Sequence, residues 1–227
     1  MIARRPALAL LASGLIAGLL LCLPLRWLMP EGALSARAVT GSIWSGSIAG
    51  AQWSGMSLGD LDAGLRWPGV LRVTSADPGA DPLRADVRPG AGMQLSALQG
   101  SVALGRSFGP ITLERISFRN ARLNQSAAGC AEAAGRITLS ARLTDMAGGP
   151  PVTLGGPLRC EGPNLVASLK SQSGMEMLEA IFFPNQGWSV KLTLRPGSPD
   201  LATALRAHGF VETPLGYVRQ MQGEAGR

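Results

Sequence analysis

Apolar and polar residues alternate along many stretches of the chain, a pattern that is typical of β-strands with one buried face. The alternation is most regular over residues 136–143 and 188–195, where aliphatic residues or tryptophan occupy one face and serine, threonine, lysine or arginine the other. Both stretches predict antiparallel strands with one face in water. Shorter strands are predicted over residues 41–47, 48–55, 61–67, 83–88, 95–104, 111–118, 152–158 and 165–169, and in the tail at 216–219.

Two of these segments carry signs of irregularity. Gly100 falls inside the 95–104 strand and indicates a turn or a bulge. The 111–118 segment begins with alternation and then changes register, which also predicts a bulge or a bend. The whole chain contains 30 glycines and 16 prolines, and this composition favours short strands and many turns over long helices.

Two short helices are predicted near the C-terminus, over residues 175–182 and 201–208. The second has the better terminal residues, because Ser198 can cap its start, Pro199 fits its first turn and Gly209 can end it. The fold class is therefore mainly β, with one or two short helices.

Residues 7–25 form an apolar run without charge, in which Ser13 is the one side chain with a clear polar group. As a helix the run would be roughly 28 Å long at about 1.5 Å per residue, close to the hydrocarbon thickness of a bilayer. Arg4 and Arg5 precede it and Arg26 follows, which favours an N-terminus in the cytoplasm. We expect a cytoplasmic tail at 1–6, a transmembrane helix at 7–25, a linker at 26–40 and a β-rich domain at 41–227 beyond the membrane.

Two other interpretations of the apolar run stay open. A cleaved signal peptide usually has a shorter apolar region and a small-x-small cleavage site near its end; here Ala36-Arg37-Ala38 lies well beyond Arg26. A lipid anchor at Cys22 would need a small residue before the cysteine, where this chain has Leu21.

Charge and cysteine content argue against nucleic-acid binding and metal binding, and predict a disulfide. The formal net charge is +6, of which three arginines flank the apolar run, and the other arginines are scattered without the basic stripe and interleaved aromatics of a nucleic-acid surface. Beyond the membrane, in an oxidising compartment, Cys130 and Cys160 would pair. A metal site is disfavoured, since two cysteines without a nearby histidine supply too few ligands.

No pattern in the sequence makes a case for an enzyme. The one histidine, His208, lies at the end of a predicted helix, where histidine often caps carbonyl groups. No serine has nucleophile-elbow spacing and no glycine-rich segment has the partners of a phosphate loop. We therefore expect no catalytic residue, no metal and no cofactor.

The order of several motifs resembles a known family. After the apolar run come Gly-Ser-Ile-Trp-Ser-Gly-Ser at 41–47, Leu-Arg-Trp-Pro at 65–68, the spaced cysteines with Gly-x-x-x-Cys at 156–160, and Gly-Tyr at 216–217. In this order the chain resembles the protein N component of bacterial type II secretion systems. The resemblance implies a single-pass inner-membrane protein with a periplasmic β-rich domain and no active site. Related domains of the AsmA-like group form a curved antiparallel sheet (a β-taco) with an apolar groove.

We hypothesise an accessory subunit of type II protein secretion that contacts other inner-membrane subunits of the system in the periplasm. Trp44, Trp53 and Trp67 are candidate partner or groove contacts, although a buried structural role is the favoured expectation for each. The alternative function is that of a periplasmic AsmA-like protein that binds lipid in an apolar groove.

Overall fold

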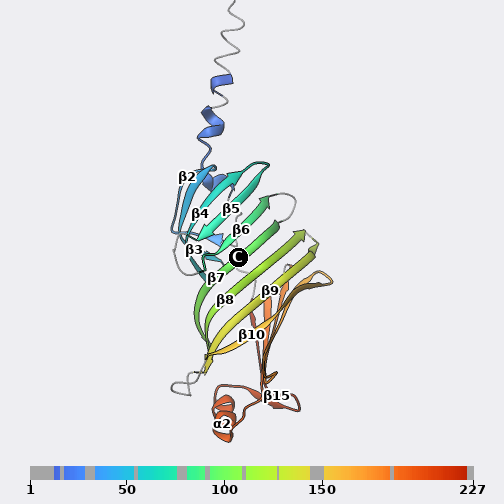
Figure 1. Ribbon diagram of the computed structural model, residues 1–227. Coiled ribbons are helices and arrows are strands. Elements are labelled where there is room, and N and C mark those ends of the chain that lie inside the picture. Colours follow the sequence, from blue (N-terminus) through green and yellow to red (C-terminus); the bar gives the residue numbers. More distant parts are fainter. Residues whose placement is uncertain are drawn as a thin grey trace, which may run out of the picture.

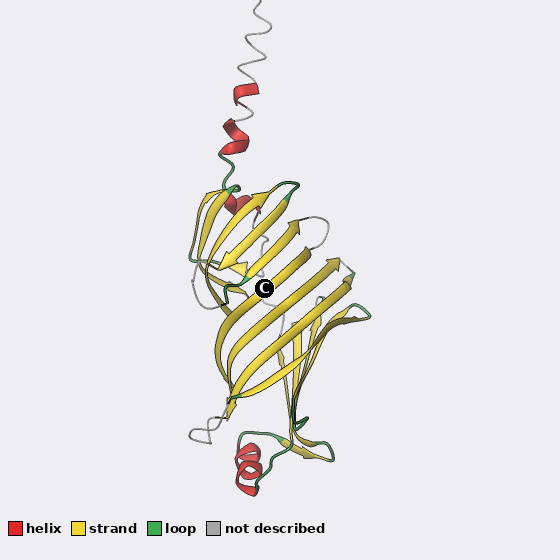
Figure 2. Ribbon diagram, viewed as in Figure 1, coloured by secondary structure: helices red, strands yellow, loops and turns green. Residues whose placement is uncertain are grey.

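The computed structural model describes residues 13–15, 18–28, 34–53, 56–75, 81–89, 93–108, 111–126, 128–143, 151–184 and 187–223. These residues form one antiparallel sheet of fifteen strands (Figures 1 and 2). The strands are β1 (Leu34–Ser35), β2 (Ala38–Ser42), β3 (Ser45–Trp53), β4 (Met56–Arg66), β5 (Val70–Ser75), β6 (Arg84–Pro89), β7 (Met93–Phe108), β8 (Ile111–Ser126), β9 (Gly129–Leu143), β10 (Val152–Glu161), β11 (Asn164–Ser171), β12 (Glu176–Phe183), β13 (Gly187–Leu194), β14 (Val211–Thr213) and β15 (Gly216–Gly223). Two helical elements have both of their ends within the described residues. They are the 3-10 turn η1 (Leu25–Leu28) and helix α2 (Pro199–Ala207).

The sheet is a meander in which almost every strand pairs with the next one in the chain. The order runs from β3 to β13 without interruption, and β15 then lies between β13 and β14. At the other end β1 and β2 both pair with β3. Both edges of the sheet are therefore short strands, which limits edge-to-edge pairing with other chains.

The central strands are long, against the expectation of short ones. Strands β7 and β8 have 16 residues each and β9 has 15. Their length is compatible with the glycine content because bulges interrupt the pairing, as between Leu98 and Gly100 in β7 and between Leu113 and Arg115 in β8. Both irregularities were predicted from the sequence. Gly100 has φ +106°, and a Cβ there would collide with the backbone of Pro82, so only glycine fits this bulge.

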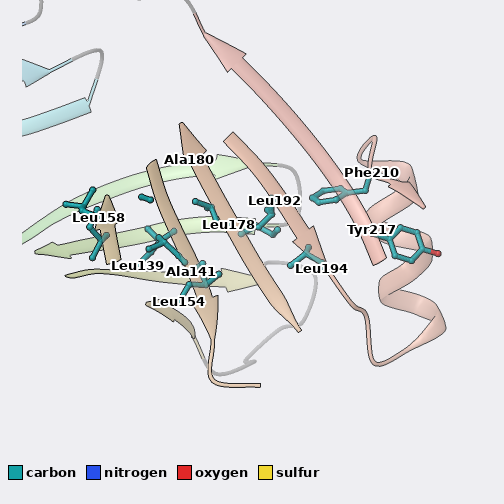
Figure 3. Packing of buried hydrophobic residues seen from close by; sticks show 14 of the residues in the cluster. Leu139, Ala141, Leu154, Leu158, Leu178, Ala180, Leu192, Leu194, Phe210 and Tyr217 are labelled. Carbon is teal, nitrogen blue, oxygen red and sulfur yellow. The ribbon is translucent and has the colours of Figure 1, made fainter. Parts of the chain in front are cut away.

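The sheet bends along its length, so that its later strands face its middle ones (Figure 1). Ile111 and Leu113 of β8 line the same small cavity as Leu192 and Leu194 of β13. Figure 3 shows the apolar side chains of β9, β10, β12 and β13 gathered on this inner face, with Phe210 and Tyr217 beside them. A second, smaller cluster lies under the first strands and consists of Leu25, Ile48, Ala51, Leu61 and Ala63.

Helix α2 has the predicted ends. Ser198 is its N-cap and accepts a hydrogen bond from the backbone N–H of Leu201 at 3.3 Å, and Pro199 opens the first turn. Leu205 is fully buried in the main core cluster, so the helix closes one end of the bent sheet. Gly209 follows with φ +79°.

Two expectations about the C-terminal region are wrong. Residues 175–182, predicted as a helix, belong to strand β12, whose residues Leu178 and Ala180 alternate into the core between β11 and β13. The polar face of β13 is not uniformly wet, because Ser189 and Thr193 are buried. Thr193 lies level with Met177 and Val218 on the neighbouring strands, and these apolar neighbours shield it.

The N-terminal expectations fall partly outside the described residues. The expected tail at 1–6 lies outside them, as does most of the predicted span at 7–25, of which residues 13–15 and 18–21 are helical. Among the described residues, no helix is long and apolar enough to cross a membrane. Strand β1 and most of β2 lie within residues 26–40, the range expected to be a linker, so the sheet begins before residue 41.

Candidate functional site

The segment that follows the apolar run is fixed to the first strands of the sheet. The backbone N–H of Ile43 donates to the carbonyl oxygen of Leu23 at 2.8 Å, and Pro24 forms an isolated bridge with Ser42. Leu25 is only 1% exposed and lies over Gly46, where a Cβ would come within 2.8 Å of its Cδ2 atom. The segment after the apolar run thus packs beside the end of β2 and the β2–β3 turn.

The three predicted contact tryptophans have different environments. Trp44 lies in the β2–β3 turn, is 44% exposed and donates a hydrogen bond from its indole Nε1 to the carbonyl oxygen of Leu20 at 3.0 Å. Trp67 directly follows β4 and is 95% exposed. The buried role, which was favoured for each from the sequence, is therefore wrong for both. Trp53 ends β3, where its backbone pairs with Leu34 and Met56, and its side chain lies outside the described residues.

The structure brings the turns of Trp44 and Trp67 to the same end of the sheet. The backbone N–H of Leu65 donates to the carbonyl oxygen of Ile43 at 2.7 Å, and Gly64 lies against the carbonyl oxygen of Trp44. Trp27, in η1, is 69% exposed and was not identified from the sequence. Its place directly after the apolar run could have indicated it, because tryptophan is enriched where a spanning segment meets water.

The inner face of the bent sheet is packed with its own side chains. The cavity between β8, β9, β10, β12 and β13 has a volume of about 20 Å³, enough for one water molecule but not for an acyl chain. Apolar residues line most of it, with Arg142 and Glu176 as its charged members. The described residues therefore form a closed core at this place rather than an apolar groove.

The predicted disulfide is present. Cys130 and Cys160 are bonded, with Cα atoms 5.6 Å apart and a sequence separation of 30. The β9–β10 ladder has its last pair at Arg136 and Pro157, and beyond it the Cys130 N–H donates to the carbonyl oxygen of Pro163 at 2.8 Å. The disulfide thus joins the two ends of the β9–β10 hairpin, whose connecting residues 144–150 lie outside the described part.

Charged groups on the described strands form ion pairs across or along the sheet surface. Arg72 of β5 donates to both carboxylate oxygens of Asp86 on β6, at 2.8 and 3.0 Å. This hydrogen bonding holds the pKa of Asp86 below its usual value and raises the pKa of Arg72. Pairs at a cross-strand position of this kind stabilise strand register.

No constellation of acid–base or ligand groups is found in the part of the chain that the structure describes. It contains no group of three or more histidine, cysteine, aspartate or glutamate residues that could hold a metal ion. Glu176 and Glu179 are three positions apart on strand β12 and therefore point to opposite sides of the sheet. Burial raises the pKa of Tyr217, which donates to Glu212 at 3.1 Å and packs in the main core.

The far edge of the sheet offers the second exposed apolar surface. Strand β14 covers only residues 216–218 of β15, and Val211 in β14 and Leu215 in the following turn are exposed. On the other side, β15 pairs with β13 through residues 217–223. The stretch of β15 from Arg219 onward therefore has one edge beyond the reach of β14.

Comparison with known proteins gives one match. A family model described as type II secretion system, protein N matches residues 32–219. The match begins just before β1 and ends within β15, so it includes nearly the whole sheet. No curated protein and no solved structure matches the chain.

Proposed function

The chain belongs to the type II secretion system protein N family, and we propose that it is a non-catalytic accessory subunit of that system, anchored in the inner membrane. In this proposal residues 1–6 lie in the cytoplasm and residues 7–22 span the bilayer. The sheet lies in the periplasm, with Leu23, Pro24 and Leu25 packed on its first strands. The observation that carries the proposal is the extent of the family match, which covers the sheet from β1 into β15.

The disulfide supports the periplasmic location. A Cys130–Cys160 bond persists in an oxidising compartment and is rare in the bacterial cytosol. It also joins the start of β9 to the end of β10, so the middle of the sheet depends on the redox state of its surroundings. The scattered arginines of the sheet give no reason to invoke nucleic acid.

Protein contact is the mode of action that the geometry supports best. The inner face is filled by the main core cluster, and its cavity of about 20 Å³ is too small for an acyl chain. Exposed apolar residues include Trp44 and Trp67 near one end of the strand order and Val211 and Leu215 at the other, besides Met175 and Phe182 at β12. We propose that the C-terminal edge, β14 with β15, contacts other inner-membrane subunits of the secretion system.

Lipid binding of the AsmA-like kind is the second candidate function. One observation favours it, namely that a single antiparallel sheet bends around an apolar inner face (Figures 1 and 3). Loading with lipid would require the β8–β10 and β12–β13 faces to separate, because their side chains now fill the space between them.

Co-purification separates the two functions. The full-length protein, tagged at its C-terminus, is crosslinked in native membranes and purified, and both proteins and phospholipids are identified by mass spectrometry. Recovery of secretion-system subunits without stoichiometric phospholipid supports the protein-contact function. Recovery of bound phospholipid that survives detergent exchange, without secretion subunits, overturns it in favour of lipid binding.

A further inference from the structure

Three exposed tryptophans lie at the end of the sheet where the apolar run enters it. They are Trp27 in η1, Trp44 in the β2–β3 turn and Trp67 in the β4–β5 turn. Figure 1 shows these turns at the end from which the N-terminal helical residues extend. We call this set of η1 and the two turns the tryptophan rim.

Hydrogen bonds and apolar packing hold the rim together. Trp44 donates to the carbonyl oxygen of Leu20 in the helical segment, and the turn of Trp44 bonds to β4 two residues before Trp67. Trp27 lines a surface recess together with Leu19 and Leu23. The Trp44 indole is therefore bonded to the apolar run, and a backbone bond joins its turn to the strand that ends at Trp67.

The surroundings of the rim are apolar on one side and basic on the other. Leu15, Leu19, Leu20 and Leu21 are exposed on the helical residues next to it. Arg26 and Arg66 are each adjacent in sequence to a rim tryptophan, and Arg88, near the end of β6, lies at the same rim beside the start of β5; all three are exposed. Among the described residues of these turns and strand ends, the charged side chains are all arginines.

We propose that the tryptophan rim rests on the surface of a phospholipid bilayer, with its indoles at the depth of the headgroups. The inference rests on the proposed membrane anchor and goes beyond it, because an anchor alone would leave the sheet free to tilt. Indole combines an apolar ring with a hydrogen-bond donor and is enriched at membrane–water interfaces. Arginines beside it are suited to anionic headgroups. We assign a bilayer as the surface that covers the rim, because the apolar run, which is long enough to span a bilayer, joins the sheet at this same end.

Contact at the rim would fix the orientation of the sheet. The first strands would lie against the membrane, while α2, which Figure 2 shows at the opposite end of the molecule, would point away from it. The exposed residues Val211 and Leu215 near α2 would then be presented to partners at a distance from the bilayer.

Tryptophan quenching by brominated lipid tests the proposal on the full-length protein. The protein is reconstituted into phosphatidylcholine–phosphatidylglycerol vesicles whose acyl chains are brominated close to the headgroup, and flotation confirms its incorporation. Trp67→Phe is the decisive variant, since this side chain is remote in sequence from the apolar run. Trp188→Phe, in β13, is the matched control.

The expected results differ between the variants. Trp67→Phe lowers the emission intensity that the brominated lipid quenches by roughly a third, because three tryptophans are assigned to the interface, and Trp188→Phe does not lower it. A protein that floats with the vesicles but whose quenching is unchanged by Trp67→Phe retains its anchor and overturns the rim contact. A protein that does not float overturns both. Shielding of Trp67 from acrylamide in native membranes but not in vesicles assigns the rim to a protein partner and also overturns the proposal.

Discussion

The indole Nε1 of Trp44 donates a hydrogen bond to the backbone carbonyl oxygen of Leu20, 3.0 Å away, across 24 positions of the chain. This bond joins the β2–β3 turn to the last helical residues of the apolar run. Together with the hydrogen bond from the Ile43 N–H to Leu23, it fixes the end of the apolar run to the β2–β3 turn.

Trp44→Phe should weaken the attachment of the apolar run to the β2–β3 turn without unfolding the sheet. A hydrogen bond of this kind contributes about 0.5–1.5 kcal/mol, so local opening should become roughly two- to tenfold more frequent. Hydrogen–deuterium exchange of the Ile43 amide measures it, and Trp67→Phe, a substitution in the neighbouring turn, serves as the control. Equal exchange in the wild type and in Trp44→Phe would show that the indole bond does not hold the segment.

Leu25→Ala should destabilise the whole protein. Its side chain is 1% exposed in the cluster under the first strands, and truncation of a buried leucine costs about 2–5 kcal/mol. Leu21→Ala is the matched control, because Leu21 is 64% exposed and its truncation should change stability by less than about 0.5 kcal/mol. Urea unfolding followed by circular dichroism in detergent micelles distinguishes them. A similar loss in both variants would argue that η1 is not part of the folded unit.

Two adjacent glycines of β10 should differ sharply in their tolerance of alanine. A Cβ at Gly156 would collide with the carbonyl oxygen of Ser168 on β11, whereas one at Gly155 would meet only Ile137 oxygen, at 3.8 Å. Gly156→Ala should cost about 1–3 kcal/mol or more through overpacking. Gly155→Ala should be neutral or stabilise the protein by up to about 1 kcal/mol, because alanine lowers the conformational entropy of the unfolded chain. Thermal midpoints compare the two, and a reversed order would contradict the β10–β11 pairing.

Removal of the disulfide should lower the free energy of unfolding strongly. The Cys130–Cys160 bond closes a loop of 30 residues, for which the chain-entropy model gives about 3–4 kcal/mol. The double variant Cys130→Ser/Cys160→Ser should lose about this much in denaturant unfolding. Cys22→Ser, which removes the exposed free cysteine, should have no comparable effect. A double variant as stable as the wild type would mean that the hairpin end is closed by its hydrogen bonds alone.

Much of this architecture was predictable because it depends on short-range patterns. Period-2 alternation identified β9 and β13, and Ser198 with Pro199 identified the start of α2. The presence of two cysteines in the domain expected beyond the membrane predicted their bond. Each of these features is set by neighbouring residues in the sequence or by the pairing of adjacent strands.

The features that were missed depend on contacts between distant parts of the chain. Residues 175–182 have no strong helix cap, and pairing with β11 and β13 on both sides makes them a strand. Thr193 is buried because Met177 and Val218 lie beside it on the neighbouring strands. The alternation within β13 does not reveal these neighbours. The exposure of Trp67 has a similar cause, since Trp67 follows the alternation of β4 but lies one residue beyond its end.

The most direct test of the central claim is a secretion assay in the organism that encodes the protein. The chromosomal copy is deleted, and the distribution of type II exoproteins between periplasm and medium is measured, with complementation by the full-length chain. A subunit of the secretion system predicts that exoproteins accumulate in the periplasm and return to the medium on complementation. Unchanged export in the deletion strain, with altered membrane phospholipid distribution instead, would contradict the account and favour the lipid-binding function.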